Sequence, residues 1–505
     1  MSAVRFRVQP LPSMALLFRL KSPPLFHSTH NTIPIPIHGY CLAKNKSDLP
    51  AALQVRIGKK TIPCSITYSH QPNQPHPHKV SFQASIYLRK GIKLLQFTST
   101  DASNRTHLHT CRLIHVQHDP LYTIPSLIPT KHRTPGINLF GFFDYVHGIA
   151  QGARLTAQTL QLHSIPHTLS RIPLPQNCEK LNPPFPLPPT KSLHHTINLF
   201  HCNAPEFHAI RKYWPRLLKA NYRTIGYWAW ELEDLPQRWS QELTHLDEIW
   251  CPTTFVRDAI ARAANKLGLS LPILVIPHPI FDPHPHPSSL PPPIDLPQKK
   301  FLILTTFDLN STLERKNPFA TIQAFRRALN KIPHLHLIIK THHTQQQPHL
   351  HQQLLHAIAD LKHHISLITQ PLSPQNLLAL QSHVHAFISL HRSEGFGLNL
   401  AEMMLLGKPV IATNWSGNTD FLDADCGCPI SYTLKPLTPD CPYQTITHGR
   451  WAEADTDHAA HAIIRLAEDP DYARQIGQNA RQKILTLYSP QVIADKIKAR
   501  ILDLA

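Results

Sequence analysis

The sequence predicts an α/β protein with two Rossmann-like, doubly wound domains, preceded by an N-terminal all-β, sandwich-like domain. From about residue 131 onward, short apolar runs typical of buried parallel strands alternate with helical patterns. Before that point, apolar and polar residues alternate in several short segments without helical patterns between them. The chain of 505 residues is also too long for a single hydrophobic core. Several domains are therefore expected.

One strand–helix–strand segment carries most of the functional information. Residues 385–390 and 410–413 are short apolar runs, and the apolar residues between them recur at helical spacing until Gly407. In such a βαβ unit, ligands bind beyond the carboxyl ends of the strands, where the helix N-terminus presents free N–H groups. We therefore look for functional residues at the first turn of this segment.

Two glycines and two glutamates occupy that turn and its helix. Gly395 and Gly397 have no side chains, so phosphate oxygens can approach the backbone closely. Glu394 lies at the mouth of the turn, and Glu402 lies two turns into the helix. Ionised carboxylates are good acceptors for sugar or ribose hydroxyls. The segment therefore predicts a sugar-nucleotide site.

A second strand-to-helix junction carries two cations. Residues 301–306 are strand-like, and Asn317-Pro318 begins an apolar helix with proline in its first turn. Arg315 and Lys316 lie between the strand and the helix. Departure of a nucleoside diphosphate builds negative charge on the leaving oxygens. One well-placed donor to such charge contributes about 3 kcal/mol, or about a hundredfold in rate.

Three neighbouring segments belong together: Ser-Glu-Gly-Phe-Gly-Leu-x-Leu-Ala-Glu at 393–402, Gly-Lys-Pro-Val-Ile-Ala-Thr-Asn at 407–414 and Ser-Gly-Asn-Thr-Asp-Phe at 416–421. Together they resemble the donor-site signature of glycosyltransferase family 4. The resemblance extends over about residues 136–485. It implies a GT-B fold and a retaining, metal-independent hexosyltransferase of polysaccharide or cell-envelope synthesis. A nucleotide sugar is then a substrate, and no cofactor is expected.

The resemblance also implies roles for individual residues of the donor half. Glu394 would bind hydroxyls of the transferred sugar, and Glu402 would bind the ribose. The diphosphate or sugar would contact amides of a short backbone segment, and two further residues would close the pocket. The amides belong to Gly395, Phe396 and Gly397, and the two residues that would close the pocket are Gly417 and Asn418.

Lys316 best matches the lysine that flanks this turn in the family. The family's Gly-Arg pair earlier in the loop is replaced by Phe307-Asp308. The sequence therefore leaves open whether Arg315 or another cation supplies the second positive charge.

The amino-terminal half offers a comparable turn. Residues 136–142 are strand-like, and Gly148 and Gly152 open a helix where family members have a Gly-x-Gly-Glu or similar turn. An acidic contact found in some relatives is therefore expected to be absent. His201, after the strand at 196–200, lies where related enzymes keep a histidine near the donor sugar.

An aromatic segment in the same half is a candidate acceptor site. Trp228 and Trp230 are able to stack on an acceptor sugar, although large aromatics more often bury their area in the core. Glu231 beside them is a candidate acceptor contact and base. Thr254, after the strand-like residues 249–252, is expected to cap a helix.

These assignments predict four segments. Residues 1–130 form a basic accessory domain, 131–290 the acceptor-side domain, and 291–485 the donor-side domain, with a proline-rich hinge at 281–293. The amphipathic helix in residues 486–505 is expected to pack back on the amino-terminal half.

The positive charge is concentrated before residue 131. Fifteen Lys and Arg against three Asp give residues 1–130 a charge of +12, of the chain's +18. Such a region either contacts anionic lipid, acidic polysaccharide or nucleic acid, or is simply a solvated basic surface. No run of 18 apolar residues is present. We therefore predict a cytoplasmic protein, free or peripheral at the inner face of the membrane, with a glycan or lipid-linked acceptor and no nucleic acid partner.

Histidine is frequent, with 37 residues. The pairs His342-His343 and His363-His364 lack a nearby carboxylate in the sequence or a zinc-binding spacing, so we attribute them to compositional bias rather than to a metal site. No metal ligand is assigned.

Two other functions stay open. A sugar-nucleotide epimerase of the same fold would keep the phosphate-binding residues but need no acceptor. A catalytically dead protein that binds polysaccharide or nucleic acid through its basic domain would fit the charge distribution. The presence of Glu394, Glu402 and Lys316 argues against the second alternative.

Overall fold

The computed structural model describes the backbone of eight strands before residue 113 and most of the chain from residue 128 to residue 504. Within the latter range the residues outside the description are 175–177, 188–191, 220–221, 284–289, 438–440, 442, 444–445 and 447–448. Side chains are described from residue 133 onward. The chain divides into one unit of residues 1–123 with 173–177, and a second unit of residues 124–172 with 178–505.

The first unit contains two separate four-stranded antiparallel sheets, in the orders β1-β2-β6-β5 and β4-β3-β7-β8. The strands are β1 Leu17–Lys21, β2 Ile35–Ala43, β3 Ala52–Ile57, β4 Lys60–Pro63, β5 Ser65–His70, β6 His78–Ile86, β7 Leu94–Thr100 and β8 Thr106–Arg112. That these sheets stack as a sandwich stays a prediction.

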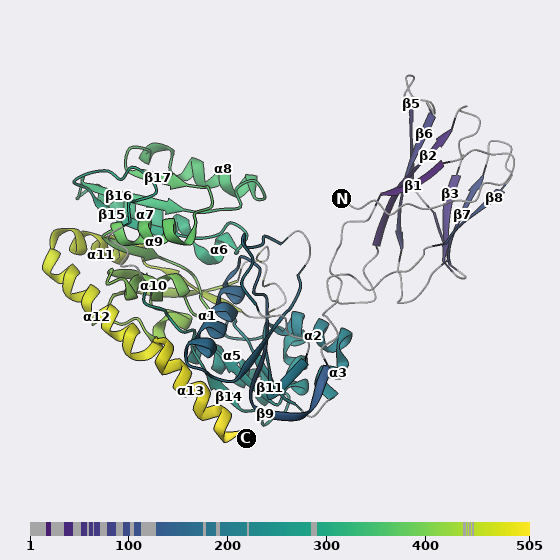
Figure 1. Ribbon diagram of the computed structural model, residues 1–505. Helices are drawn as coiled ribbons and strands as arrows, with labels where there is room; N and C mark the ends of the chain where they lie inside the picture. Colours follow the sequence, from purple (N-terminus) through teal and green to yellow (C-terminus); the bar gives the residue numbers. More distant parts are fainter. Residues whose placement is uncertain are drawn as a thin grey trace. The chain divides into compact units, whose positions relative to one another are not determined.

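The second unit contains two six-stranded parallel sheets covered by helices (Figure 1). The amino-terminal sheet has the order β10-β9-β11-β12-β13-β14. Its strands are β9 Ile128–Gly141, β10 His167–Arg171, β11 Ser192–His201, β12 Arg223–Tyr227, β13 Glu248–Cys251 and β14 Ile273–Val275. Its helices are α1 Gly148–Leu162, α2 Ala204–Tyr213, α3 Pro215–Lys219, α4 Gln237–Ser240, η3 Gln241–His245 and α5 Thr254–Lys266.

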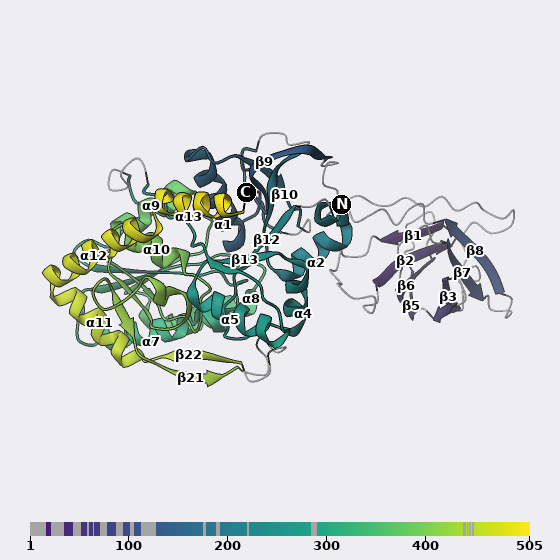
Figure 2. The same cartoon turned by 90° about the horizontal axis from the view of Figure 1, so that it is seen from below.

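The carboxyl-terminal sheet has the order β17-β16-β15-β18-β19-β20. Its strands are β15 Phe301–Thr306, β16 Leu335–Lys340, β17 Ile365–Ile368, β18 Ala386–Ser389, β19 Val410–Thr413 and β20 Cys428–Ile430. Its helices are α6 Leu313–Lys316, α7 Pro318–Leu329, α8 Pro348–Ala357, η5 Ala359–Leu361, α9 Pro374–His383, α10 Leu398–Leu405, η6 Ser416–Asp420, α11 Thr456–Glu468 and α12 Pro470–Tyr488. A hairpin of β21 Tyr432–Pro436 and β22 Arg450–Ala454 stands apart from the sheet (Figure 2).

The strand orders fix where ligands bind. In the carboxyl-terminal sheet the order reverses between β15 and β18, and in the amino-terminal sheet it reverses between β9 and β11. Open α/β sheets bind ligands beyond the carboxyl ends of the strands at such switch points. The turns after β15 and β18 carry Lys316 and Glu394, and β11 ends at His201. The sequence prediction of two doubly wound α/β domains is confirmed.

Several expected boundaries shift in the structure. β9 begins eight residues before Gly136, because residues 128–134 pair with the start of β11. Thr253, rather than Thr254, is the N-cap of α5, since its hydroxyl accepts a hydrogen bond from the amide of Val256. Residues 284–289 of the expected hinge lie outside the described residues. None of the described helices is long and apolar enough to cross a membrane.

The last helix, α13 Pro490–Asp503, follows α12 from the carboxyl-terminal domain onto the amino-terminal one (yellow in Figure 1). It contacts α1 and β9, and Ile493, Ile497 and Ile501 join the core of the amino-terminal domain. The Arg500 guanidinium pairs with Glu248, whose carboxylate is fully buried, at 2.7 and 2.9 Å. Apolar burial and one ion pair therefore attach this helix.

We expect Arg500→Ala to lower the free energy of unfolding by about 2 kcal/mol, because a buried carboxylate loses its main counterion. Glu248 keeps a weaker contact with Arg223 at 3.6 Å and a hydrogen bond from Trp250 at 2.7 Å, which limits the loss. Denaturant unfolding measures the change, with the exposed Lys498→Ala as the control. Equal unfolding midpoints for the two variants would contradict this account of the helix.

Candidate functional site

Three charged side chains meet at the switch point of the carboxyl-terminal sheet. The Lys316 ammonium lies 2.5 Å from one oxygen of Glu394, and the Arg315 guanidinium lies 3.2 Å from the other. Arg315 also donates to the carbonyl of Ser393 and to the hydroxyl of Ser311, each at 2.9 Å. The two turns predicted separately from the sequence are thus joined, and Arg315 is the second cation beside Glu394.

The electrostatics of this cluster favour the ionised forms of Glu394 and Arg315, whereas burial lowers the pKa of Lys316 and Glu394 opposes that shift. Burial alone would raise the pKa of Glu394, but Lys316 and Arg315 outweigh it and hold the pKa at about 2. Burial works against the charge of Arg315, yet Glu394 and Glu231 raise its pKa. Lys316 and Arg315 contact Glu394 here, and a second carboxylate, Glu231, lies 4.0 Å from Arg315. The two fixed cations of this cluster are groups that bind anions.

Close backbone packing fixes the position of Glu394. Its amide donates to the hydroxyl of Ser416 at 2.8 Å, and the amide of Gly417 donates to its carbonyl at 2.9 Å. A Cβ on Gly417 would lie 2.3 Å from the carbonyl oxygen of Gly395. The turn after β19 therefore supports the turn after β18 only while position 417 is glycine.

Gly417→Ala should displace this backbone and lower the affinity for a nucleoside diphosphate at least tenfold, because a methyl group cannot fit against the Gly395 carbonyl. Lys362→Ala is the control, since it truncates an exposed side chain of the same domain. Thermal unfolding and equilibrium binding measure both variants. Wild-type affinity in Gly417→Ala would show that the glycine is not needed for the site.

Glu402 lies further into α10 and has no cation partner among the described residues. Burial raises its pKa to about 7, although a hydrogen bond with Gln381 opposes this shift. Burial disfavours the ionised form of this carboxylate, so hydrogen bonds donated by a ligand would stabilise it. Glu402 is the fifth residue of α10, nearer to the helix start than the two turns expected from the sequence, and its role as a hydroxyl-binding residue stays a prediction.

The other predicted donor residues differ in what they present. Phe396 is 4% exposed, and its ring packs against Phe421, Tyr488 and His278, so only its backbone is free to face a ligand. Gly397 adopts a left-handed φ of +97° as the N-cap of α10, a conformation that favours glycine.

Asn418 is fully buried and donates to the carbonyl of Thr413 at 3.0 Å. Its side chain therefore covers the end of β19 on the inside of the domain.

The amino-terminal domain contributes a group of histidines. A Cβ on Gly152 would lie 2.4 Å from the ring of His278 and 2.9 Å from that of His201, so α1 packs directly on both rings. His201 stacks on Tyr227 with ring centroids 4.1 Å apart, and neither of its ring nitrogens has a partner among the described residues. Burial, reinforced by His278, holds the pKa of His201 well below its ordinary value. A neutral ring is thus kept at the end of β11.

The predicted acceptor residues fall into two groups. Trp228 is fully buried, and Trp230 is 6% exposed and packs tilted against Trp239 with ring centroids 4.5 Å apart, so both indoles belong largely to the core. Glu231 is more exposed, and its carboxylate lies 4.0 Å from Arg315. Burial raises the pKa of Glu231, with Arg315 opposing the shift. Only Glu231 joins the charged cluster.

The two domains contact each other directly at this site. The hydroxyl of Thr253 donates to the carbonyl of Gly395 at 2.9 Å, and the hydroxyl of Ser393 donates to the carbonyl of Glu231. A Cβ on Gly395 would lie 3.0 Å from the carbonyl oxygen of Trp230. Gly395 is therefore needed for the close approach of the domains as well as for any ligand contact.

Sequence reasoning missed two residues here. Tyr443, from the segment between β21 and β22, lies against Trp230 with ring centroids 5.5 Å apart, and burial raises its pKa. Glu206 lies in the first turn of α2, shortly after β11, and burial raises its pKa to about 7. Tyr443 lies outside every motif. One feature of the sequence could have indicated Glu206 as a site residue, namely its position in the turn after a predicted strand.

Comparison with known proteins agrees with this geometry. Residues 293–426 match the family of glycosyl transferases group 1. This group 1 segment includes β15, β18 and α10, and therefore carries Lys316, Glu394 and Glu402. No curated protein sequence matches the chain.

Solved structures of similar fold cover about three quarters of this chain. A glycosyltransferase from Rickettsia africae ESF-5 has a TM-score of 0.52 at 15% identity, covering 74% of this chain and 99% of its own. Alr3699/HepE from Anabaena, in complex with UDP and glucose, has a TM-score of 0.50 at 13% identity, covering 73% and 99%. Sucrose-phosphate synthase from Thermosynechococcus elongatus has a TM-score of 0.50 at 14% identity, covering 75% and 99%.

These identities show the fold alone, which is the two-domain GT-B arrangement. The chain spans about half of S. aureus TarM, with 55% of that chain covered. The expected GT-B fold of the second unit is confirmed.

Proposed function

We propose that the protein is a glycosyltransferase that moves a hexose from a nucleoside-diphosphate sugar to the hydroxyl of a glycan or a lipid-linked saccharide. Transfer is retaining, as in glycosyltransferase family 4, and needs no metal ion. The observation that carries the proposal is the pairing of Lys316 and Arg315 with Glu394 at the topological switch point of the group 1 segment.

This arrangement suits the departure of a nucleoside diphosphate. The diphosphate carries the charge that develops when the sugar leaves, and we propose that it binds next to Lys316, Arg315 and the N-terminus of α10. Because these groups neutralise the charge on the diphosphate, a divalent cation is not required for that purpose. Glu394 is ionised at all physiological pH values because its pKa is about 2, so it accepts hydrogen bonds from sugar hydroxyls.

The remaining groups divide between the donor and the acceptor. Glu402 binds the ribose hydroxyls, and the neutral ring of His201 faces the donor sugar from the amino-terminal domain. Glu231 is the acceptor-side carboxylate, since it lies next to Arg315 and is more exposed than Trp228. Support for a UDP-hexose donor comes from HepE, whose structure contains UDP and glucose.

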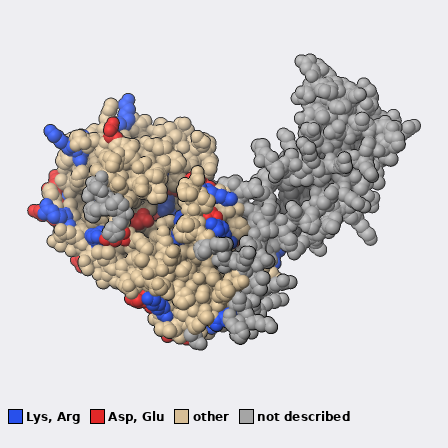
Figure 3. Space-filling model, viewed as in Figure 1, with Lys and Arg blue, Asp and Glu red and all other residues tan. Residues whose placement is uncertain are grey.

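The basic region of residues 1–130 is proposed to hold the enzyme at an anionic membrane surface or at an acidic glycan, on the cytoplasmic side. The second unit does not share this character. On the face seen in Figure 3, its Lys and Arg residues are scattered among Asp and Glu instead of forming one patch.

The proposed activity is tested by the release of nucleoside diphosphate. Full-length protein is incubated with UDP-, GDP-, ADP- and dTDP-hexoses, with and without a panel of saccharide and lipid-linked saccharide acceptors. We expect one donor to give rapid release that requires an acceptor. Conversion of the donor to an isomer without release would identify an epimerase, and no turnover of any donor, together with no stabilisation by any, would contradict a transferase.

A further inference from the structure

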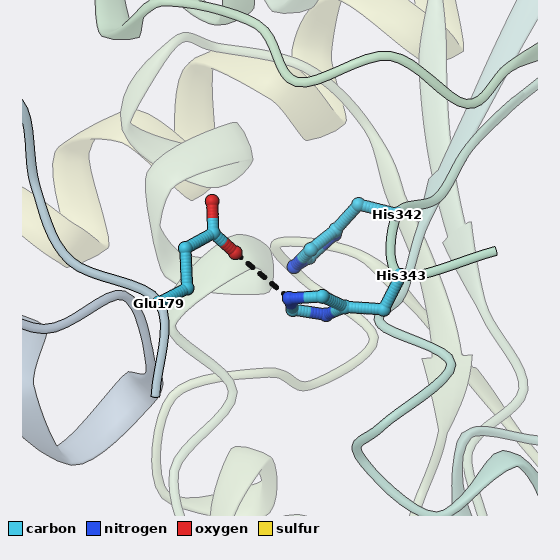
Figure 4. Close-up of side chains that lie close together, drawn as sticks. All are labelled: Glu179, His342 and His343. Carbon is cyan, nitrogen blue, oxygen red and sulfur yellow. Dashed lines mark hydrogen bonds and ion pairs between the residues drawn. The ribbon is translucent and has the colours of Figure 1, made fainter. Parts of the chain in front are cut away.

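Four side chains gather at the domain junction outside the charged cluster of Lys316, Arg315 and Glu394. Glu179 comes from the segment before β11, and His342 and His343 follow β16. Figure 4 shows the Glu179 carboxylate and the two imidazoles pointing toward one another. One ligand atom from each of the three residues lies within 4.8 Å of the others. Asp308, from the turn after β15, contacts both histidine rings.

We propose that Glu179, His342 and His343 form a binding site for a divalent transition-metal ion of the zinc type, which links the two Rossmann-like domains. Two imidazoles and one carboxylate are a ligand set that zinc accepts in proteins, with a fourth position left to water. Imidazole nitrogen favours such ions over magnesium or calcium, which prefer oxygen ligands.

The backbone at this point brings the two rings together. Neighbouring side chains on an extended segment point to opposite sides. His343 instead adopts a left-handed φ of 63°, and the ring centroids of His342 and His343 lie 4.3 Å apart. A residue other than glycine seldom adopts this conformation, so the pair is held in place by its surroundings.

Metal-binding histidines usually donate a hydrogen bond from their other ring nitrogen to a residue outside the ligand set, and Asp308 is the acceptor here. Its carboxylate lies 2.6 Å from Nδ1 of His343. Because a carboxylate only accepts hydrogen bonds, Nδ1 carries a proton toward Asp308, and Nε2 carries one toward Glu179 at 2.7 Å. A carboxylate–histidine contact of this kind orients the ring and raises the basicity of the metal-binding nitrogen.

The charge and the spacing also fit a cation. Two carboxylates, Glu179 and Asp308, face the imidazoles, and the Lys340 ammonium, which interacts with both, donates to the carbonyl of Thr341 at 3.3 Å. An ion between Nε2 of His343 and Glu179 would replace the proton there, and it would require these two atoms to separate by about half an ångström. Glu179 has room to move, since 40% of its side chain is exposed.

The position of the ion would connect two turns of the proposed active site. The carbonyl of Glu179 accepts a hydrogen bond from the amide of Val146, just before Gly148, at 3.1 Å. Asp308 lies in the loop that leads to Arg315. Bound there, the ion would hold one turn of each domain in place, and the proposal assigns it no step of sugar transfer.

The test counts zinc ions bound by the full-length protein. Wild type, Glu179→Gln, His343→Asn and a double control, His363→Ala with His364→Ala, are titrated with Zn²⁺ in competition with a chromogenic chelator. The control removes the other histidine pair, of which His363 is exposed. We expect wild type and the control to retain one more ion than the two site variants, and Zn²⁺ to raise the unfolding temperature of wild type more than that of Glu179→Gln.

Equal zinc retention by all four proteins would overturn the proposal, because it would show adventitious binding by the many other histidines. Unchanged binding in Glu179→Gln with loss in His343→Asn would overturn the link between the domains. Glu179→Gln changes a half-exposed side chain, so folding is expected to survive even if His343→Asn is unstable. No sugar nucleotide is needed, so the result is independent of the proposed transferase activity.

Discussion

Lys316→Ala should lower turnover about a hundredfold while the fold is kept. Lys316 and Arg315 flank Glu394, and loss of one well-placed cation from a developing oxyanion costs about 3 kcal/mol. Arg315 remains, so binding of the ground-state donor should weaken less than turnover falls. Steady-state kinetics with the identified donor and acceptor measure both effects, and circular dichroism checks the fold.

Lys362→Ala, an exposed lysine of the same domain, is the matched control and should leave turnover unchanged. Glu394→Gln should also lower turnover, at least tenfold, because an amide no longer balances the two cations and accepts hydrogen bonds less strongly. Near-normal turnover in both Lys316→Ala and Glu394→Gln would mean that this cluster is not the donor site.

Glu402→Gln should make the protein more stable and bind its nucleotide less well. The pKa of Glu402 is raised from 4.5 to about 7, so the folded protein favours the protonated form. The folded state of the wild type therefore loses stability as the pH rises from 4.5 to about 7, and the loss is complete above that range. Glutamine has no charge to bury, so the variant should gain up to about 3 kcal/mol at pH 8 and almost nothing at pH 4.5.

The same variant should lose ten- to a hundredfold in affinity for the nucleoside diphosphate, because the ribose hydroxyls lose hydrogen bonds to a charged acceptor, worth about 1.5–3 kcal/mol. Chemical unfolding at the two pH values and calorimetric binding supply the data, with the exposed Glu468→Gln as the control. A gain in stability with unchanged affinity for the nucleoside diphosphate would show that Glu402 is a buried structural residue without a role in binding.

Much of the second unit could be predicted because its strands are local apolar runs. β15 and β19 were predicted with the bounds they have in the structure, and Gly407 ends α10 with a left-handed φ of +69°. The turns that follow these strands carry the charged residues, and parallel topology brings such turns to one edge. The sequence pattern alone therefore assigns Lys316 and Glu394 to one site.

What the sequence could not supply depends on contacts between distant segments. Glu179 and His343 are 164 positions apart, so the pair His342-His343 had no visible carboxylate partner and was attributed to composition. Thr253 caps α5 in place of Thr254, since local pattern does not resolve a shift of one residue. Tyr443 reaches the site from a hairpin outside every motif.

The most direct test of the central claim is equilibrium binding of nucleoside diphosphates to the full-length protein. UDP, GDP, ADP and dTDP are titrated into wild type, Lys316→Ala and Lys362→Ala. The account predicts that at least one diphosphate binds wild type and Lys362→Ala equally, and binds Lys316→Ala at least tenfold more weakly. Equal affinity for all three proteins, or no binding of any diphosphate to wild type, would contradict it.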